Sequence, residues 1–310
     1  MPERRSHAMH RVSIAADDRP ARTRATLVGG VAVLLWALLA ALTASTGEVP
    51  PLQLNAMAFA VGGLLGVAWA VRARGWRGFG AVLRDQPPLA WAIGVGGLFG
   101  YHALYFAALN AAPPAEASLI AYLWPLLIVL MAALLPGEGL RAGHVAGAVL
   151  GFAGAGLLIA TREGGVGGGL GTAILSGHVL ALGCALLWSA YSVGSRLMGA
   201  VPTEAVAGYC LAVALLSLPL HLALEPTVWP ATGGEWLAVL GLGLGPVGAA
   251  FYAWDRGCKR GDIQLLGTLA YAAPVLSTLV LIALGLASAT WALAGATALV
   301  TLGAVVASRA

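Results

Sequence analysis

The chain of 310 residues is 59% apolar and only 10% charged, and its formal net charge is +4. A soluble domain carries roughly 25% charged residues, so most of this surface must face something other than water. The connections between the apolar runs are short, which excludes an additional soluble domain.

Apolar runs recur along the whole chain, and a run of about 20 apolar residues crosses a bilayer as a helix. Strands of a membrane barrel are about 10 residues long and alternate in polarity, so helices are expected. Ten spans are predicted, at residues 27–45, 52–71, 89–110, 114–135, 143–161, 176–197, 203–224, 235–254, 263–284 and 288–308. The predicted fold class is an all-α integral membrane protein with ten transmembrane helices.

Basic residues are distributed unevenly over the connections. If the spans alternate in direction, 16 of the 17 lysines and arginines fall on one side of the membrane, and only Arg162 falls on the other. By the positive-inside rule that side is the cytoplasm, and both termini lie there. Residues 1–26 are expected to form a disordered cytoplasmic tail, whose arginines set this topology or bind anionic lipid. The basic balance reports topology, so no nucleic-acid partner is expected.

The two halves of the chain resemble each other. Leu35-Trp36 recurs 152 residues later as Leu187-Trp188, and the Tyr-x-x-Pro segment that ends at Pro125 recurs 149 residues later, ending at Pro274. Each half holds five spans, and because five is odd the second half enters from the opposite side, which makes a 5+5 inverted-topology repeat. The predicted divisions are a first repeat at 27–161, a periplasmic linker at 162–175 and a second repeat at 176–308.

Spans 3 and 4 carry the densest set of candidate substrate contacts. Tyr101 and Tyr105 are four residues apart near mid-span and share one helix face, where their rings can stack on a substrate and their hydroxyls orient it. An interfacial aromatic belt is the alternative. His102 is the only mid-span titratable side chain near the expected path. It either holds a substrate carboxylate or a proton, or is a neutral histidine bonded to a neighbouring helix.

Two prolines are expected to interrupt helices at matching places in the halves. Pro125 and Pro274 each remove one helical hydrogen bond and free a carbonyl, which either accepts from a substrate ammonium group or marks a structural kink. Tyr122 and Trp124 are two residues apart, so both reach the cavity only if the helix is distorted there.

The remaining cavity candidates lie in spans 1 and 6. Trp36 and Trp188 are repeat mates near mid-membrane that either pack in the core or line the cavity. Tyr191 follows Trp188 by three residues and shares its face.

At the end of span 8, Tyr252 and Trp254 are expected to form a cytoplasmic gate or an interfacial belt. Lys259 either attracts a substrate carboxylate at the inner mouth or takes part in local ion pairs. The three cysteines lie in two spans and one loop, so no disulfide, metal site or cofactor is expected.

The ten spans, the repeat, the mid-span tryptophans of spans 1 and 6 and the Tyr-x-x-Pro segments resemble the EamA type of the drug/metabolite transporter superfamily. The segment 115–125 is typical of it, and residues 100–106 and 256–262 are most similar to its aromatic amino-acid exporters. The resemblance implies a carrier of the bacterial inner membrane that exports amino acids or related metabolites by alternating access. Many members carry a glutamate just before the proline of spans 4 and 9, whereas this chain has Trp124 and Ala273. Proton coupling through such a carboxylate is therefore not expected.

The sequence thus predicts a monomeric carrier in the bilayer whose small-molecule site lies between the halves. No Asp, Glu, Lys or Arg occupies the middle third of a span, which favours movement down a gradient. Drug, nucleoside or nucleotide-sugar carriers of the same superfamily are the alternatives, although the mid-spans lack the cations that nucleotide phosphates need. A membrane enzyme acting on lipid would need polar catalytic residues clustered at one interface. No such cluster is present in the sequence, so no catalytic residue is assigned.

Overall fold

The structure is a computed structural model, and it describes residues 19–132, 141–161, 172–195, 200–261, 269–270 and 272–309. Every regular element among these residues is a helix. The first half contains α1 (Arg19–Ala37), α2 (Leu39–Ala44), α3 (Pro51–Arg84), α4 (Pro88–Ala111), α5 (Pro114–Ala121), α6 (Trp124–Ala132) and α7 (Ala142–Ala160). The second half contains α8 (Thr172–Ser195), α9 (Ala205–Leu224), α10 (Gly233–Leu244), the π-helix η3 (Gly245–Ala249), α11 (Ala250–Arg260), α13 (Ala272–Ala283) and α14 (Trp291–Ser308).

Local sequence explains where several helices begin. Pro51, Pro88 and Pro114 are the first residues of α3, α4 and α5, positions at which the missing N–H costs no helical hydrogen bond. Thr232 and Thr290 cap α10 and α14, because each hydroxyl accepts from a backbone N–H three residues later.

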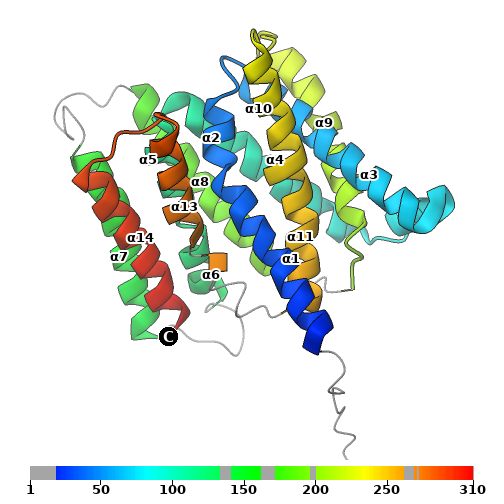
Figure 1. The fold of residues 1–310 in the computed structure, drawn as a ribbon, viewed down its shortest axis with the longest axis horizontal. Coiled ribbons are helices and arrows are strands. Elements are labelled where there is room, and N and C mark those ends of the chain that lie inside the picture. The colour runs from blue at the N-terminus through cyan, green and yellow to red at the C-terminus, as the bar shows by residue number, and fades with distance from the viewer. Residues whose placement is uncertain are drawn as a thin grey trace, which may run out of the picture.

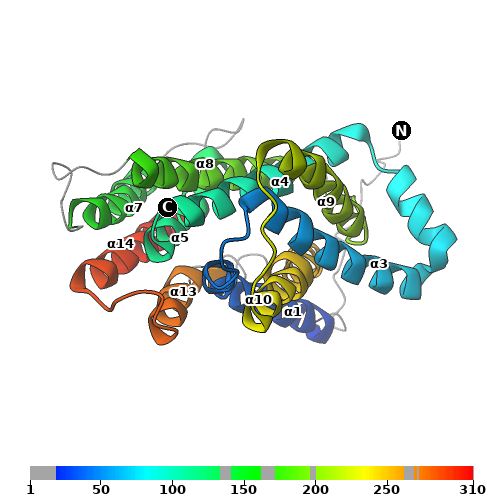
Figure 2. The same cartoon turned by 90° about the horizontal axis from the view of Figure 1, so that it is seen from above.

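The helices lie side by side in one elongated bundle (Figure 1). Viewed from one end, α7 and α14 lie at one extreme of the long dimension and α3 lies at the other (Figure 2). The four most extensively packed helix pairs are α7 with α14, α3 with α9, α4 with α8 and α1 with α11. Each of these pairs joins the first half of the chain to the second.

Glycines permit the closest of these approaches. A Cβ added at Gly147 on α7 would lie 2.5 Å from the Gly303 carbonyl oxygen on α14, and one added at Gly303 would lie 2.6 Å from the Gly147 carbonyl oxygen. Small residues at such crossings let helix backbones pack directly on one another in lipid.

Each of the ten expected apolar runs contains at least one helix. Six helical stretches are long and apolar enough to cross a membrane, and they are Pro20–Ala44, Pro51–Arg84, Pro88–Ala111, Leu175–Val193, Ala205–Leu224 and Gly233–Gly257. Shorter apolar helices cover Ala142–Leu157, Ala272–Ala283 and Trp291–Ala307. Large apolar side chains such as Leu215 (72% exposed) face outward, as expected of a surface that contacts lipid.

Three expected boundaries differ in the structure. Residues 19–26 belong to α1 instead of a tail, and residues 172–175 belong to α8 instead of a linker, while the rest of both segments lies outside the described residues. The second span is also longer than expected, because α3 continues to Arg84 through a bend at Gly75 (φ 69°). Glycine adopts this left-handed conformation at no steric cost.

Candidate functional site

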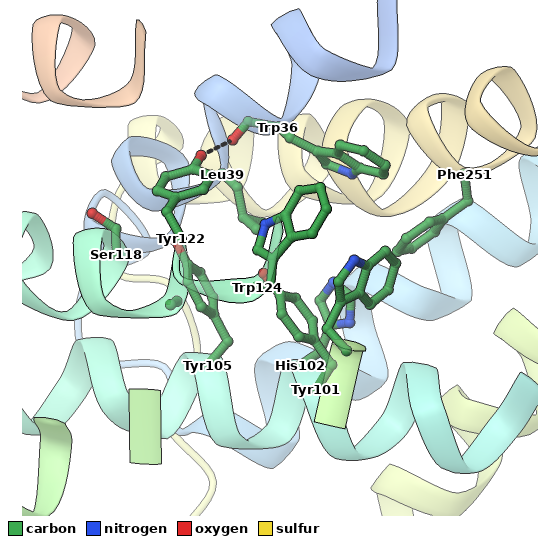
Figure 3. A pocket seen from close by; sticks show the side chains of 11 residues that line it. Trp36, Leu39, Tyr101, His102, Tyr105, Ser118, Tyr122, Trp124 and Phe251 are labelled. Atoms are coloured by element: carbon green, nitrogen blue, oxygen red, sulfur yellow. Dashed lines mark hydrogen bonds between the residues drawn. The ribbon is translucent and has the colours of Figure 1, made fainter. Parts of the chain in front are cut away.

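A cavity lies in the middle of the bundle, where α4, α8 and α11 face the α1–α2 and α5–α6 junctions (Figure 3). It is lined by Trp36, Leu39, Tyr101, His102, Tyr105, Ser118, Ala121, Tyr122, Trp124, Trp188 and Phe251. Its empty volume, mouth included, is about 430 Å³, but the centres of water molecules can occupy only about 20 Å³ of it. The lining rings therefore leave room for about one water, and a larger molecule can enter only if they move apart.

Interrupted helices surround this cavity. The first span breaks at Leu38 between α1 and α2, and the fourth breaks at Tyr122 and Leu123 between α5 and α6. The eighth passes through the π-helix η3 directly before α11 and Phe251. Non-helical backbone at membrane depth is tolerated where it lines a cavity or finds partners in the protein.

Side chains from neighbouring helices bond the carbonyl groups near these breaks. The Tyr122 hydroxyl donates to the Trp36 carbonyl oxygen at 3.1 Å (Figure 3). Trp36 Nε1 donates to the Pro246 carbonyl oxygen in η3 at 3.1 Å, and the Ser189 hydroxyl on α8 donates to the Trp124 carbonyl oxygen at 3.0 Å. The breaks are thus held in place by bonds between the two halves, as well as by bonds within the first.

The two prolines lie in the first turns of short helices. Pro125 is the second residue of α6, directly after the break that places both Tyr122 and Trp124 on the cavity. Pro274 is the third residue of α13 and is buried. In a first turn a proline removes no hydrogen bond that the helix would otherwise make. The distortion expected around Tyr122 is therefore a full interruption of the helix.

Aromatic rings on α4 form one wall. Tyr101 and Tyr105 stack with ring centroids 5.7 Å apart and planes 10° apart. The Tyr101 ring also lies 4.9 Å from that of Trp188 on α8. Trp188 in turn lies 6.1 Å from Trp36 and 6.4 Å from Trp124, both edge-on. The sequence candidates of four different spans therefore meet in a single cluster.

His102 is 1% exposed and packs edge-on against Phe59 at 4.8 Å and Phe251 at 5.6 Å. Its Nδ1 lies 3.0 Å from the Leu98 carbonyl oxygen. A carbonyl only accepts, so Nδ1 carries a hydrogen, and in the neutral ring Nε2 is an acceptor. The histidine thus bonds its own helix, and its second nitrogen remains available for a ligand.

Four sequence candidates lie outside the lining. Tyr191 packs on Trp188 at 5.2 Å and covers Gly97, where an added Cβ would lie 2.4 Å from its ring. The Tyr252 hydroxyl donates to the Gly62 carbonyl oxygen at 2.9 Å, on the α3 side of α11. Trp254 packs against Trp36 at 5.1 Å, next to the cavity. Lys259 belongs to α11, but its side chain lies outside the described part of the chain.

Three lining residues were not expected from the sequence: Leu39, Ser118 and Phe251. Ala121, four residues before Pro125, was expected only through the carbonyl that this proline would free. Phe251 and Trp254 are three apart and share a helix face, from which Tyr252 is turned by about 100°. The three-residue spacing could have indicated Phe251, whereas Leu39 and Ser118 carry no such signal.

Among the described residues, the lining contains no Asp, Glu, Lys or Arg. Glu116 on α5 pairs with His178 of α8, whose Nε2 lies 2.9 Å from the carboxylate. The His178 ring is buried, at 4% exposure. Glu116 lies in the first turn of α5, where the helix dipole also favours its charge.

A bundle of apolar helices around a central, uncharged cavity with interrupted helices is the architecture of a membrane transporter. The sequence pattern of the EamA-like transporter family matches the chain twice, at residues 23–160 and 175–309. The chain belongs to this family, which confirms the resemblance read from the sequence. It is therefore a multi-pass membrane transporter.

Two individual proteins are similar over nearly the full length. The chain is 55% identical over 287 residues to the aromatic amino acid exporter YddG of Ancylobacter novellus, and the alignment covers 93% of this chain and 98% of that protein. A solved crystal structure matches with a TM-score of 0.72 and 56% identity, covering 92% of this chain and 96% of the other.

Proposed function

We propose that the protein exports neutral amino acids, aromatic ones among them, by binding them in the central cavity and exposing that cavity alternately to the two sides of the membrane. The observation that carries the proposal is the lining itself, whose described residues combine stacked aromatic rings with polar edges and include no charged side chain. Such a lining suits a molecule with an apolar body and no net charge. The name of the exporter from Ancylobacter novellus supports the same substrate class.

The polar atoms of the cavity suit the head group of an amino acid. His102 Nε2 accepts from an ammonium group when the ring is neutral, and the hydroxyls of Tyr101 and Tyr105 donate to a carboxylate. The rings of Trp124 and Trp188 provide faces on which a substrate side chain stacks. No further cation or anion is needed for a zwitterion, because its own charges sum to zero.

An inverted repeat is the second part of the proposal. The double match to one family description supports two related halves. If each span is exchanged with the one five places later, the pairs α7–α14 and α3–α9 map onto themselves, and α4–α8 maps onto α1–α11. This is the relation expected of halves related by a pseudo-two-fold axis. Rocking of such halves about the central site exposes it to one side at a time.

Orientation, energetics and assembly complete the proposal. The positive-inside rule supports cytoplasmic termini in a bacterial inner membrane. The described lining residues include no charged side chain, which supports facilitated movement without proton coupling, since proton-coupled carriers commonly use an intramembrane carboxylate. A monomer that moves its substrate without catalysing a reaction is the last part of the proposal.

The test is flux of radiolabelled tryptophan, phenylalanine and leucine in liposomes containing the full chain. We expect counterflow of these amino acids, loss of flux in Trp124→Ala, and normal flux in the control Trp229→Ala, whose ring is 62% exposed outside the cavity. Flux of none of them, or an active Trp124→Ala protein, contradicts the site. Unlabelled nucleosides and cationic drugs serve as competitors, and stronger competition by either points to the alternative substrate class.

A separate measurement tests coupling. A pH gradient of about one unit is imposed on the same liposomes with the labelled amino acid at equal concentration on both sides. We expect equal final concentrations, because the described residues of the cavity include no carboxylate to carry a proton. Accumulation above equality contradicts the uncoupled mechanism but leaves the substrate assignment intact.

A further inference from the structure

The end of α3 forms a distinct surface segment, residues 76–84, that begins after the bend at Gly75. In the view from above this segment turns away from the rest of α3 at the edge of the bundle (Figure 2). A Cβ added at Gly75 would meet no atom within 4 Å, so glycine is needed here for its positive φ of 69° and not for space. The sequence therefore directs this segment along the bundle edge.

One face of the segment is fixed to the foot of α9. Phe79 and Val82 are only 6% and 8% exposed. A Cβ added at Gly208 would lie 2.4 Å from Leu83 Cδ2, so the leucine packs directly on the α9 backbone. This contact fixes which side of the segment faces outward.

The outward face is aromatic and basic. Trp76 is 72% exposed and Arg77 is exposed beside it, and Arg72 is exposed directly before the bend at Gly75. Arg74 is already paired with Glu204 at 2.7 Å. Arg72 and Arg77, by contrast, have no acidic partner among the described residues.

An exposed apolar stripe leads to these cations. Leu65 and Trp69 are 36% and 39% exposed and precede Arg72 by seven and three residues, so all three share one face of α3. The stripe is the length of about two helical turns. An exposed apolar stripe that ends at Arg72, with Trp76 and Arg77 directly after the bend, matches an acyl chain, a phosphate and the bilayer interface in that order.

We propose that this face, from Leu65 to Arg77, binds an anionic phospholipid, with the acyl chain along Leu65 and Trp69 and the head-group phosphate between Arg72 and Arg77. Charge complementarity identifies the occupant, because two cations without an acidic partner in the described part of the chain lie beside an apolar surface that already contacts lipid. In the proposed orientation the site belongs to the cytoplasmic leaflet, which carries the anionic lipid surface.

The experiment is native mass spectrometry of the full chain in neutral detergent, with phosphatidylglycerol and phosphatidylcholine of identical acyl chains. We expect the wild type to retain phosphatidylglycerol about thirtyfold more than phosphatidylcholine, because each of the two basic residues at a lipid surface contributes about 1 kcal/mol. The double variant Arg72→Gln/Arg77→Gln should lose most of this preference. The double variant Arg72→Lys/Arg77→Lys should keep part of it, since lysine retains the charge but not the fork geometry.

The control is Arg256→Gln/Arg309→Gln, which removes the same charge from exposed positions on α11 and at the end of α14. We expect it to retain the lipid preference of the wild type. Equal losses in both glutamine variants would mean diffuse attraction and overturn the proposal, as would a wild type without preference. Displacement of phosphatidylglycerol by millimolar inorganic phosphate would also overturn it, because the acyl chain contact would then contribute nothing.

Discussion

The two sides of the cavity differ although the halves of the chain are similar. Of the eleven described residues that line the cavity, nine come from the first half, and Trp188 and Phe251 come from the second. The second half acts mainly through groups that hold the first in position. The Pro246 carbonyl receives the Trp36 indole N–H, and the Ser189 hydroxyl bonds the Trp124 carbonyl. Two halves that match the same family thus contribute differently to the described lining, in which the first half supplies most of the side chains and the second mainly supplies support.

The difference between the two halves is tested most directly by substitutions in the aromatic wall that the first half forms. Tyr101→Ala removes ring contacts with His102, Tyr105 and Trp188 at 4.8, 5.7 and 4.9 Å. Loss of these pairs loosens the wall, and a ring stacked on the substrate would itself contribute about 0.5–1.5 kcal/mol, so we expect substrate affinity to fall about tenfold, measured by flux and by thermal shift with substrate. Tyr101→Phe keeps the rings and should lose far less. A larger loss of substrate affinity in Phe251→Ala than in Tyr101→Ala would contradict the idea that the first half supplies the main substrate contacts.

The next prediction concerns the contact between the halves far from the cavity. Gly147→Ala places a methyl group 2.5 Å from the Gly303 carbonyl oxygen, and backbone on both sides prevents relief. We expect destabilisation of about 1–3 kcal/mol and a lower melting temperature in detergent. Gly156→Ala on the same helix meets open space and is the matched control. Equal melting temperatures for the two variants would show that α7 and α14 tolerate separation.

The smallest expected effect comes from the support supplied by the second half. Ser189→Ala removes the hydroxyl that bonds the Trp124 carbonyl at the α5–α6 break. We expect a loss of about 1 kcal/mol, seen as an approximately fivefold rise in the substrate concentration for half-maximal flux. Ser217→Ala is a matched control, because that buried hydroxyl also bonds its own helix but contacts Asn55 outside the cavity. The support model fails if both variants change flux equally.

The sequence was sufficient for the helical architecture and for most of the cavity. Apolar run length marks spans because lipid leaves no alternative to internal hydrogen bonding. Seven of the nine predicted substrate contacts line the cavity, because large aromatics at mid-span have few other roles there. Their function in substrate binding stays a prediction.

The features that the sequence did not predict share one physical origin, which is local irregularity of the backbone. The break at Leu38 lies in a run without proline or glycine, and it aims Leu39 into the cavity. The π-helix at Gly245–Ala249 shifts the register of α11, so that Phe251 and not Tyr252 lines the cavity. The sequence does not indicate the bend at Gly75 either, because glycines are common in these helices. Such features depend on tertiary partners, and the helical periodicity of a single segment carries no information about those partners.

The pairing of helices across the two halves has a consequence for how the chain is made. The four most extensively packed pairs each need a helix that is translated late, from α8 onward. In the two-stage description of membrane folding, helices insert singly and then associate. The first five spans must therefore remain in the bilayer without their main packing partners until the second half has been translated and inserted. A truncated first half should be a substrate for membrane quality-control proteases, and co-expression of the second half as a separate chain should rescue it.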